Sequence, residues 1–493
     1  NAELIARHAD KVVFPAAMVL KRFREIAQVS PEKIVIRPQG VLRKNPYKNC
    51  RVEAYRKICK KHNLKSDTQI VLSIAYIDKR KGPDLFVEMA LHVLKLKPKT
   101  TFIWIGHSEP EMEAAVKSRI VELGLQEQVL FIGFVHEPMD YYAAASVYAL
   151  TSREDPFPNV VLESAEVGVP VVAFQGASGA SDFIVEHGGR LADYLNTKDF
   201  ASQVCELLDL PFKEVSVGVD SLQQYTLDLL HHLNGFPRIS VLVPNYNYER
   251  YISKRLDTIY GQTFPIYEVI ILDDASIDQS VNIIDAYLER TGNEAIVIVN
   301  EKNSGSVFLQ WQKGISLSRG DLLWIAEADD LADSGFLNEL SSVFKNPDLV
   351  MAYSQSKQID DNGKIVAENY LEYTKDVSDC WLIDYEREGL EEISEALVIK
   401  NTIPNVSAVL FRRRSIEDAF SDIGEELFNY RVAGDWLVYL HVLKKGDVYF
   451  CRKPLNLHRR HTKSTTNSTQ KLKHVEEVSS VQAVARVLSA PSR

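Results

Sequence analysis

The sequence predicts an α/β protein made of two Rossmann-like modules, and two observations support that prediction. Short apolar runs alternate along the chain with amphipathic helical patterns, which indicates parallel sheets covered by helices on both faces. A Gly-Phe-Pro step at residues 235–237 interrupts the alternation, which then starts again at once. A chain of 493 residues is long enough for two or three domains, each with its own core.

The first series of elements opens with two short strands around a helix and continues into a larger sheet. Its strands are continuous apolar runs, as expected of parallel strands buried on both faces. The predicted strands are 11–14, 33–36, 69–75, 100–105, 128–132, 146–150 and 169–173. The predicted helices are 16–27, 83–96, 109–123, 159–167, a stretch from 198 to the break at 210–211, and 219–233.

The second series repeats the architecture without repeating a motif, so we do not interpret it as a duplication. Its predicted strands are 239–243, 268–272, 295–299 and 321–326, and its predicted helices are 249–260, 278–290 and 305–317. After residue 330 the pattern is irregular. Residues 470–493 are polar and compatible with a helix, and they carry no chemistry that we can assign.

Composition excludes several classes of function. The net charge of −10 and the pI near 5.7 argue against a nucleic-acid binder, although local basic groups still suffice for a phosphate-bearing ligand. Five widely spaced cysteines without a CxxC indicate a reducing cytosol, with no disulfide framework and no zinc site. We find no membrane-spanning apolar run and no signal peptide. Because the first residue is Asn, we expect a trimmed chain or a fragment of a longer one.

In the second series, polar motifs follow the strands at the edge where a doubly wound sheet binds its ligand. The segment VPNYNYERY comes after the first strand. We expect Pro244 to end the strand, Tyr246 and Asn247 to lie at the crevice, and Glu249 to lie in the first turn of the next helix. The alternative is a strand-to-helix loop with an asparagine cap.

The segment LDDASID follows the second strand and places two adjacent carboxylates at its end. Asp273 and Asp274 are suited to accept hydrogen bonds from a base N–H and from ribose hydroxyls. The alternative is a capping turn in which Asp278 caps the next helix.

The segment WIAEADD is poorly explained by folding alone, because three acids within four residues repel one another. Glu327, Asp329 and Asp330 become useful if their oxygens hold a divalent cation. Such a cation would act as a Lewis acid on a departing sugar-nucleotide diphosphate.

Two later segments add a candidate base and a candidate basic cluster. Asp435 opens a predicted helix in AGDWLVYL, either as an N-cap or as a general base that takes a proton from an attacking hydroxyl. The segment LNLHRRHTKST holds two histidines and two arginines, which could complete a metal site and bind phosphate oxygens.

Together these motifs resemble the family 2 glycosyltransferases, which have the GT-A fold and invert configuration. The resemblance covers residues 238 to about 465, in the order VPNYN, DDAS, NSG, RGD, EADD, GDW, HRRH. It implies that Asp273 and Asp274 contact the nucleotide, that Asp435 is the base, and that His461 is the late metal-binding histidine. The metal-binding DxD motif corresponds to Glu327-Ala328-Asp329, and its first acid is Glu. This difference leaves open which of Glu327, Asp329 and Asp330 touches the ion.

The mechanism implied by this resemblance is a single displacement. Asp435 would deprotonate an acceptor hydroxyl, whose oxygen attacks the anomeric carbon opposite the nucleotide. Mg²⁺ or Mn²⁺ held by Asp329 and His461 would stabilise the departing diphosphate.

The first series carries its own candidate site. In SREDPFPNVVLESAEVGVPVVAF, Pro158 can start a helix, and Glu163 in its early turns could accept two hydrogen bonds from a ribose diol. The helix N-terminus favours a diphosphate, and Arg80 and Lys81 of DKRKGPDLFVEMA add positive charge. The alternative is that Glu163 is an ordinary first-turn acid stabilised by the helix dipole.

With PEKIVIRPQGV, these segments make residues 11–209 resemble the C-terminal, donor-binding lobe of the family 4 glycosyltransferases, which have the GT-B fold and retain configuration. The paired acids of that family correspond to Asp155 and Glu163, and its usual glycine and phosphate-binding arginine to Ala75 and Tyr76. Because the acceptor-binding lobe is missing, we expect this half to bind a nucleotide weakly or not at all and not to catalyse transfer.

The resemblances divide the chain into five parts. Residues 1–45 are a remnant and crossover from a missing GT-B lobe, 46–210 the donor-binding lobe, 211–237 a helical linker, 238–470 the GT-A domain and 471–493 a C-terminal helical tail.

The parent protein is then expected to be a two-headed bacterial glycosyltransferase that uses a nucleotide sugar to build a surface polysaccharide. Its acceptor would be a lipid-linked or growing glycan, and the protein would be cytoplasmic and at most peripheral at the inner membrane face. Two alternatives remain: the family 4-like lobe is the active transferase, or the chain is a non-catalytic scaffold that binds a glycan or a partner.

Overall fold

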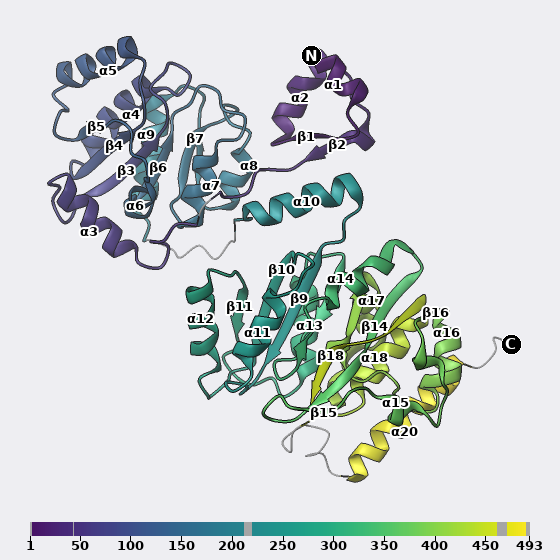
Figure 1. Cartoon of the computed structure of the whole chain (residues 1–493). Helices are drawn as coiled ribbons and strands as arrows, with labels where there is room; N and C mark the ends of the chain where they lie inside the picture. Colours follow the sequence, from purple (N-terminus) through teal and green to yellow (C-terminus); the bar gives the residue numbers. More distant parts are fainter. Residues whose placement is uncertain (1, 43, 212–218, 461–470, 490–493) are drawn as a thin grey trace. The chain divides into compact units, whose positions relative to one another are not determined.

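The computed structural model describes residues 2–42, 44–211, 219–460 and 471–489 (Figure 1). It divides the chain into two compact units, Asn1–Asn234 and Gly235–Arg493. Each unit contains a β-sheet covered by helices and has its own hydrophobic cores.

The large sheet of the first unit has six parallel strands in the order β5-β4-β3-β6-β7-β8. In chain order this is 3-2-1-4-5-6, the order of a doubly wound dinucleotide-binding sheet, whose switch point lies between β3 and β6. The strands are β3 (Gln69–Ile74), β4 (Thr100–Ile105), β5 (Val129–Phe131), β6 (Val147–Leu150), β7 (Val171–Phe174) and β8 (Arg190–Ala192).

Helices cover both faces of this sheet, because successive strand residues point to opposite sides. Val71 of β3 packs in one core, whereas Ile70 and Leu72 pack in the other. The first core is completed by α4 (Pro83–Leu96), α5 (Pro110–Glu122) and α9 (Thr197–Asp209). The second is completed by α3 (Arg51–Lys61), α6 (Met139–Ala144), α7 (Asn159–Glu166) and α8 (Ser181–Glu186).

A small βαβ segment precedes this sheet, and a helix follows it. The segment comprises α1 (Ala2–His8), β1 (Val12–Phe14), α2 (Ala17–Ile26), η1 (Pro31–Lys33) and β2 (Ile34–Ile36), and β1 pairs in parallel with β2. After it, Arg37 donates to Asp228 at 2.8 Å and to Asp220 at 2.7 Å. These bonds hold α10 (Leu222–Asn234) against the crossover within the first unit.

The sheet of the second unit has ten strands, and its main path is β11-β10-β9-β12-β17-β14-β18-β13. The first four strands are parallel, and β17 runs antiparallel to β12. The strands are β9 (Ile239–Asn245), β10 (Glu268–Asp273), β11 (Ile296–Val299), β12 (Leu322–Ile325), β13 (Leu331–Ala332), β14 (Leu349–Ile359), β15 (Ile365–Ala367), β16 (Tyr385–Arg387), β17 (Val409–Arg412) and β18 (Asp447–Arg459).

This sheet also separates two cores. Leu242, Leu272 and Ile325 pack against α13 (Val307–Leu317), α17 (Arg413–Ile423), α18 (Gly434–Leu443) and α20 (Lys471–Leu488). Val241, Ile271 and Trp324 pack against α11 (Ile252–Tyr260), α12 (Ser280–Thr291) and α14 (Phe336–Ser341). The remaining short elements of this unit are η2 (Ser342–Lys345), α15 (Leu371–Thr374), η3 (Cys380–Leu382), α16 (Gly389–Glu392), η4 (Ile393–Leu397), η5 (Val406–Ala408) and η6 (Gly424–Asn429).

Two boundaries at the first motif were predicted wrongly. Pro244 does not end β9, which continues to Asn245. On one side, Pro244 pairs with Leu272 of β10. On the other side, β12 ends at Ile325, which pairs with Leu242, so no residue of β12 lies opposite Pro244. The missing N–H of Pro244 therefore removes no ladder bond. Helix α11 begins at Ile252, so that Glu249 lies in the turn before the helix and not in its first turn.

The five cysteines are all free. Among the residues that the structure describes, no helix has the length and apolar character needed to cross a membrane.

Candidate active site

The candidate site of the second unit lies at the switch point of its parallel strands. The order β11-β10-β9-β12 is 3-2-1-4 in chain order. After β9 the chain therefore adds β10 and β11 on one side of β9, and then returns to add β12 on the other side. The loops after β9 and β12 therefore diverge and leave a crevice, which is where such sheets bind ligands. Tyr246 and Asn247 follow β9, and the segment 326–330 follows β12.

Asn247 and Glu249 join the loop after β9 to the loop after β10. Asn247 accepts from the Ile277 N–H at 2.8 Å, and Glu249 accepts from the Gln279 N–H at 2.9 Å. Asn247 has a left-handed backbone (φ 58°), which asparagine tolerates better than most residues. Neither residue caps α11, whose N-cap is Tyr251, so the predicted alternative of an asparagine cap is wrong. Tyr246 is 43% exposed and remains available for a ligand.

The two carboxylates after β10 are buried and already hydrogen-bonded. Asp273 accepts from the Asn245 amide at 2.6 Å and from the N–H and hydroxyl of Ser276 at 2.8 and 2.7 Å. Asp274 accepts from the Ser304 N–H at 2.9 Å. It also accepts from the side chains of Asn300, Ser304 and Gln310. Both acids fix loops of the crevice, and their contact with a nucleotide stays a prediction.

Asp278 accepts from the Ser280 N–H at 2.9 Å and from the Glu249 N–H at 3.0 Å. It therefore closes a turn ahead of α12, whose N-cap is Gln279, so the alternative in which Asp278 caps this helix is wrong.

The three acids after β12 form a cluster of like charge. Burial and the charges of Asp329 and Asp330 raise the pKa of Glu327 to about 8, against the lowering effect of a 3.1 Å hydrogen bond from the Trp311 indole. Burial and Asp329 also raise the pKa of Asp330. Asp330 accepts from the Arg459 N–H at 2.7 Å and from the Asn405 side-chain amide, and so ties this loop to the end of β18.

A buried arginine, Arg255 of α11, lies near this cluster and was not identified from the sequence. Arg255 is 0% exposed, and its guanidinium lies 4.8 Å from the ring centroid of Trp324. Among the residues that the structure describes, none is a hydrogen-bond partner of its side-chain nitrogens. Burial lowers its pKa to about 10, and the three acids act in the opposite direction. The signal in the sequence was its position: Arg255 falls on the apolar stripe of Ile252, Leu256 and Ile259, where a charged residue needs a partner.

The acid cluster fits a divalent cation in charge and in ligand type. Carboxylate oxygens are the ligands that Mg²⁺ and Mn²⁺ prefer, and a bound cation would favour the ionised form of Glu327, whose pKa burial and the neighbouring acids raise. Within the described part of the chain, no group of three or more His, Cys, Asp or Glu side chains is arranged to hold a metal ion. The predicted ligand His461 lies outside the described residues. His458 does lie near the cluster, since its charge lowers the pKa of Asp330, and its Nδ1 is 2.6 Å from the Tyr370 hydroxyl.

Asp435 lies in the first turn of α18 and has the properties of a base. Burial raises its pKa to about 6, while hydrogen bonds from the backbone and from the side chains of Asn401 and Tyr439 lower it. Its carboxylate accepts from the Trp436 N–H at 2.7 Å. The N-cap of α18 is Ala433, so the alternative of a capping role for Asp435 is wrong. A carboxylate with a pKa near neutrality is suited to general base catalysis.

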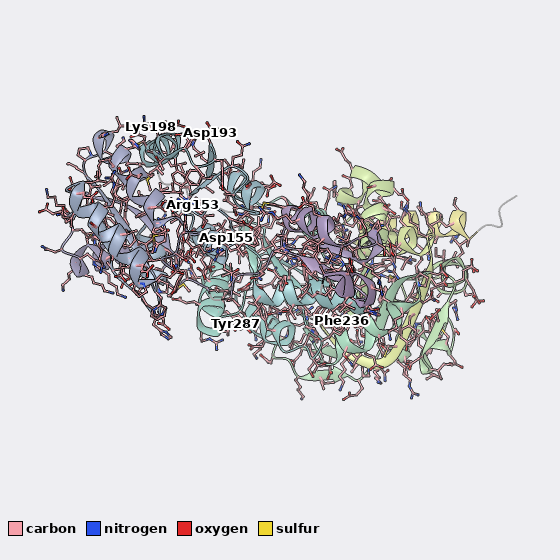
Figure 2. All side chains as sticks on the ribbon, turned by 90° about the horizontal axis from the view of Figure 1, so that it is seen from above. Arg153, Asp155, Asp193, Lys198, Phe236 and Tyr287 are labelled. Atoms are coloured by element: carbon pink, nitrogen blue, oxygen red, sulfur yellow. The ribbon has the colours of Figure 1, made fainter. Side chains whose placement is uncertain are left out.

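In the first unit, the predicted donor-binding side chains lie at the switch point between β3 and β6. Lys81 forms an ion pair with Asp155, and Arg80 donates to the Glu154 carbonyl at 3.3 Å. Arg153, which is labelled with Asp155 in Figure 2 and lies two residues before it, binds Asp84 through both carboxylate oxygens. The positive charge of Lys81 is thus already matched by an acid of the same loop system.

Glu163 lies in the middle of α7, which has no acidic residue in its first turn and whose N-cap is Pro158. The alternative of a first-turn acid is therefore wrong. Its carboxylate accepts a hydrogen bond of 2.5 Å from Tyr142, which is fully buried. Tyr76, at the position where the resemblance expects an arginine, is 45% exposed.

Comparison with known proteins finds a match to a family model in each unit. Residues 55–218 match the model of the glycosyl transferases group 1, and residues 240–420 match the model of glycosyl transferase family 2. Glycosyltransferase GlyG of Streptococcus pneumoniae is 29% identical over 194 residues, which are 39% of this chain and 58% of that protein. Poly(ribitol-phosphate) beta-glucosyltransferase of Bacillus spizizenii is 34% identical over 99 residues, 20% of this chain and 16% of that protein.

The Vi polysaccharide biosynthesis protein VipC/TviE of Salmonella typhi is 30% identical over 125 residues, 25% of this chain and 21% of that protein. The chain thus spans 58% or less of the length of each of these three relatives. Among solved structures, the S. aureus TarS fragment 1–349 with UDP-GlcNAc has 20% identity and a TM-score of 0.41, and the match covers 52% of this chain and 68% of that one. Two successive parts of the chain thus match glycosyltransferase models, residues 55–218 that of group 1 and residues 240–420 that of family 2.

Proposed function

We propose that residues 238–470 transfer a sugar from a nucleotide sugar to a hydroxyl of a glycan acceptor in the synthesis of a bacterial surface polysaccharide. The observation that carries this proposal is the cluster of Glu327, Asp329 and Asp330 at the switch point of the parallel strands, where burial and the charges of neighbouring acids raise the pKa of Glu327 and of Asp330. Relatives named for Vi polysaccharide biosynthesis and for glucosylation of poly(ribitol-phosphate) support a polymeric acceptor.

The proposed reaction is one displacement with inversion, in which Asp435 is the catalytic base. Asp435 takes the proton of the acceptor hydroxyl, and the oxygen forms a bond to the anomeric carbon as the bond to the nucleotide diphosphate breaks. The pKa of about 6 leaves Asp435 mostly ionised at neutral pH, yet basic enough to accept the proton.

The donor would lie in the crevice beside the loops that follow β9, β10 and β12. Tyr246 is positioned to pack against it, and Asp273 and Asp274 hold the loops and are proposed to contact the nucleotide. Pro244, Asn247 and Glu249 act by holding the first of these loops. Mg²⁺ or Mn²⁺, when bound by Asp329 with Glu327 beside it and His461, would neutralise the leaving diphosphate.

For the first unit we propose a weak nucleotide site or none. The pairing of Lys81 with Asp155 and the hydrogen bond from Tyr142 to Glu163 occupy the side chains that a donor would need. The proposed division keeps residues 1–45 as the remnant of a missing lobe, 46–210 as the donor-binding lobe and 211–237 as the linker. An acceptor carried on a lipid would make the protein cytoplasmic and peripheral at the inner membrane face.

A thermal-shift panel of UDP, GDP and dTDP, with and without Mn²⁺, tests the proposal. A ligand at 100 times its Kd stabilises the folded chain by about 2.7 kcal/mol. We expect one nucleotide to stabilise the chain only when Mn²⁺ is present, and Asp329→Ala to abolish that effect. Absence of any shift in the wild-type chain would favour the scaffold alternative.

A further inference from the structure

The C-terminal helix α20 packs into the second unit and is not a free tail (Figure 1). Val481 and Ala485 are completely buried in the core that also contains Trp436 and Leu437 of α18. One acidic side chain of this helix, Glu477, is also buried, with 8% exposure. A buried carboxylate has to be hydrogen-bonded to be stable, so its partners show what the helix holds.

Glu477 binds the N-terminus of the helix that carries Asp435. Its carboxylate accepts from the N–H groups of Arg431 at 2.9 Å, Val432 at 2.8 Å and Ala433 at 3.2 Å. These residues lead directly into α18, whose N-cap is Ala433. A carboxylate at this end also complements the helix dipole. The segment that enters the base helix is thus held by a residue far along the chain.

A second contact of α20 lies close to Asn401, whose side chain hydrogen-bonds to Asp435. Gln482 donates to the carbonyl of Ile399 at 2.7 Å, two residues before Asn401. Hydrogen bonding by the Asn401 side chain is one of the effects that lower the pKa of Asp435. Tyr430, just before the segment that Glu477 holds, lies 3.0 Å from the Ser480 hydroxyl of the same helix. Helix α20 therefore contacts the chain immediately before each of the two residues of the Asn401–Asp435 pair.

We propose that α20 positions the base of the transfer reaction, with Glu477 as a positioning residue for Asp435. The inference rests on the proposed function, in which Asp435 takes the acceptor proton. Loss of the Glu477 carboxylate leaves three backbone donors of the 431–433 segment unpaired, so the first turn of α18 loosens and Asp435 leaves its productive position. Misplacement of a catalytic group by about 1 Å can reduce a rate about 100-fold.

The test compares Glu477→Ala and Glu477→Gln with Glu476→Ala in the full chain. Glu476 is the matched control, because it is the neighbouring glutamate of the same helix and is exposed. Release of UDP from UDP-glucose and UDP-N-acetylglucosamine gives kcat and KM, and hydrogen exchange reports the amides of residues 431–435. For Glu477→Ala we expect faster exchange at these amides, a fall in kcat of about 10- to 100-fold, and a KM for the donor within about twofold of wild type.

Glu477→Gln keeps one acceptor oxygen, so it should retain more activity than Glu477→Ala, and Glu476→Ala should match the wild-type chain. Unchanged amide exchange in Glu477→Ala would overturn the inference, and so would faster exchange with an unchanged kcat. Failure of the proposed function has a different signature: the wild-type chain releases no UDP, or Asp435→Asn releases it at the wild-type rate. A parallel rise in KM and fall in Mn²⁺-dependent UDP binding would show general unfolding of the site and would also contradict a positioning role.

Discussion

At the scale of single residues, Asp435 determines the pH dependence of the proposed transfer. Burial raises its pKa to about 6 from the ordinary value of 3.8, and only the ionised form can accept a proton. We therefore expect kcat/KM to be constant above about pH 7 and to fall about tenfold per pH unit well below pH 6. A pH–rate profile measured at saturating Mn²⁺ checks this expectation.

Asp435→Asn keeps the shape of the side chain but removes the base, and should lower kcat by about 10²- to 10⁴-fold. UDP binding should be unchanged in this variant, which separates loss of the base from loss of the donor site. A profile whose acid limb lies near pH 4 would assign proton transfer to a different group.

Arg255 provides a second prediction at this scale. It is a buried positive charge beside three acids, and its side chain has no hydrogen-bond partner within the described part of the chain. Arg255 lowers the pKa of Glu327 and of Asp330, so Arg255→Met should raise both. The pKa of Glu327 is higher in the folded chain, at about 8, than the ordinary value of 4.5. The folded state therefore binds more protons than the unfolded state between these values, and this group makes the fold less stable as the pH rises.

Removal of Arg255 raises the pKa of Glu327 further, so the ionisation of Glu327 at high pH costs the folded state more. Arg255→Met should therefore destabilise the chain more at pH 8 than at pH 5. Urea unfolding at the two pH values measures the difference, and Arg255→Lys, which keeps the charge, serves as the matched control. Equal destabilisation at both pH values would mean that Arg255 acts through packing on Trp324 alone.

The sequence predicted where these candidate residues lie in the fold, but it did not predict their hydrogen-bond partners. The positions of Glu327, Asp329, Asp330 and Asp435 follow from their places after strands and before a helix, which local pattern reveals. The partners of Asp330 come from residues 405 and 459, and no local rule predicts which distant donors meet a buried carboxylate. Arg255 was missed for the same reason, because its electrostatic role depends on acids that follow another strand.

At the scale of elements, the βα units were predictable and the later sheet was not. The predicted strands 69–75, 100–105 and 268–272 coincide with β3, β4 and β10 to within one residue at each end. These strands are buried on both faces and lie between helices, so their apolar runs are continuous and sharply bounded. In contrast, β14 and β18 contain polar residues and pair with irregular register, which removes the regular pattern that identifies a strand.

The loop after β9 gives a prediction at this scale, because it combines a side-chain bond with an unusual backbone. Asn247 has φ 58° and accepts from the Ile277 N–H. Asn247→Gly removes only the hydrogen bond and should destabilise the second unit by about 1 kcal/mol. Asn247→Ala also forces a left-handed alanine, which adds about 1–2 kcal/mol.

Unfolding in urea measures both Asn247 variants, and the difference between them isolates the backbone cost. If Ala and Gly were equally tolerated, the loop would relax to another conformation and would not be a rigid wall of the crevice.

At the scale of the whole molecule, the chain is two units with separate cores, and this division predicts separable behaviour. No buried core cluster in the described residues mixes side chains from the two sides of the Asn234–Gly235 boundary. The bonds of Arg37 to Asp220 and Asp228 keep α10 with the first unit. We therefore expect residues 1–234 and 235–493 to fold when expressed separately, each with one cooperative unfolding transition.

Their ligand responses should then differ, because the two candidate sites differ in charge. Residues 235–493 should keep the full Mn²⁺-dependent stabilisation by the nucleotide that the whole chain shows, since the acid cluster and Asp435 both lie within them. Residues 1–234 should respond weakly or not at all, because Lys81 is already paired with Asp155. In Asp155→Asn this lysine loses its charged partner, so a diphosphate that bound the variant more tightly than wild type would show that the ion pair suppresses the site. If residues 1–234 instead bound UDP as tightly as residues 235–493, the first unit would be a working donor site, and the alternative of an active group 1 lobe would gain support.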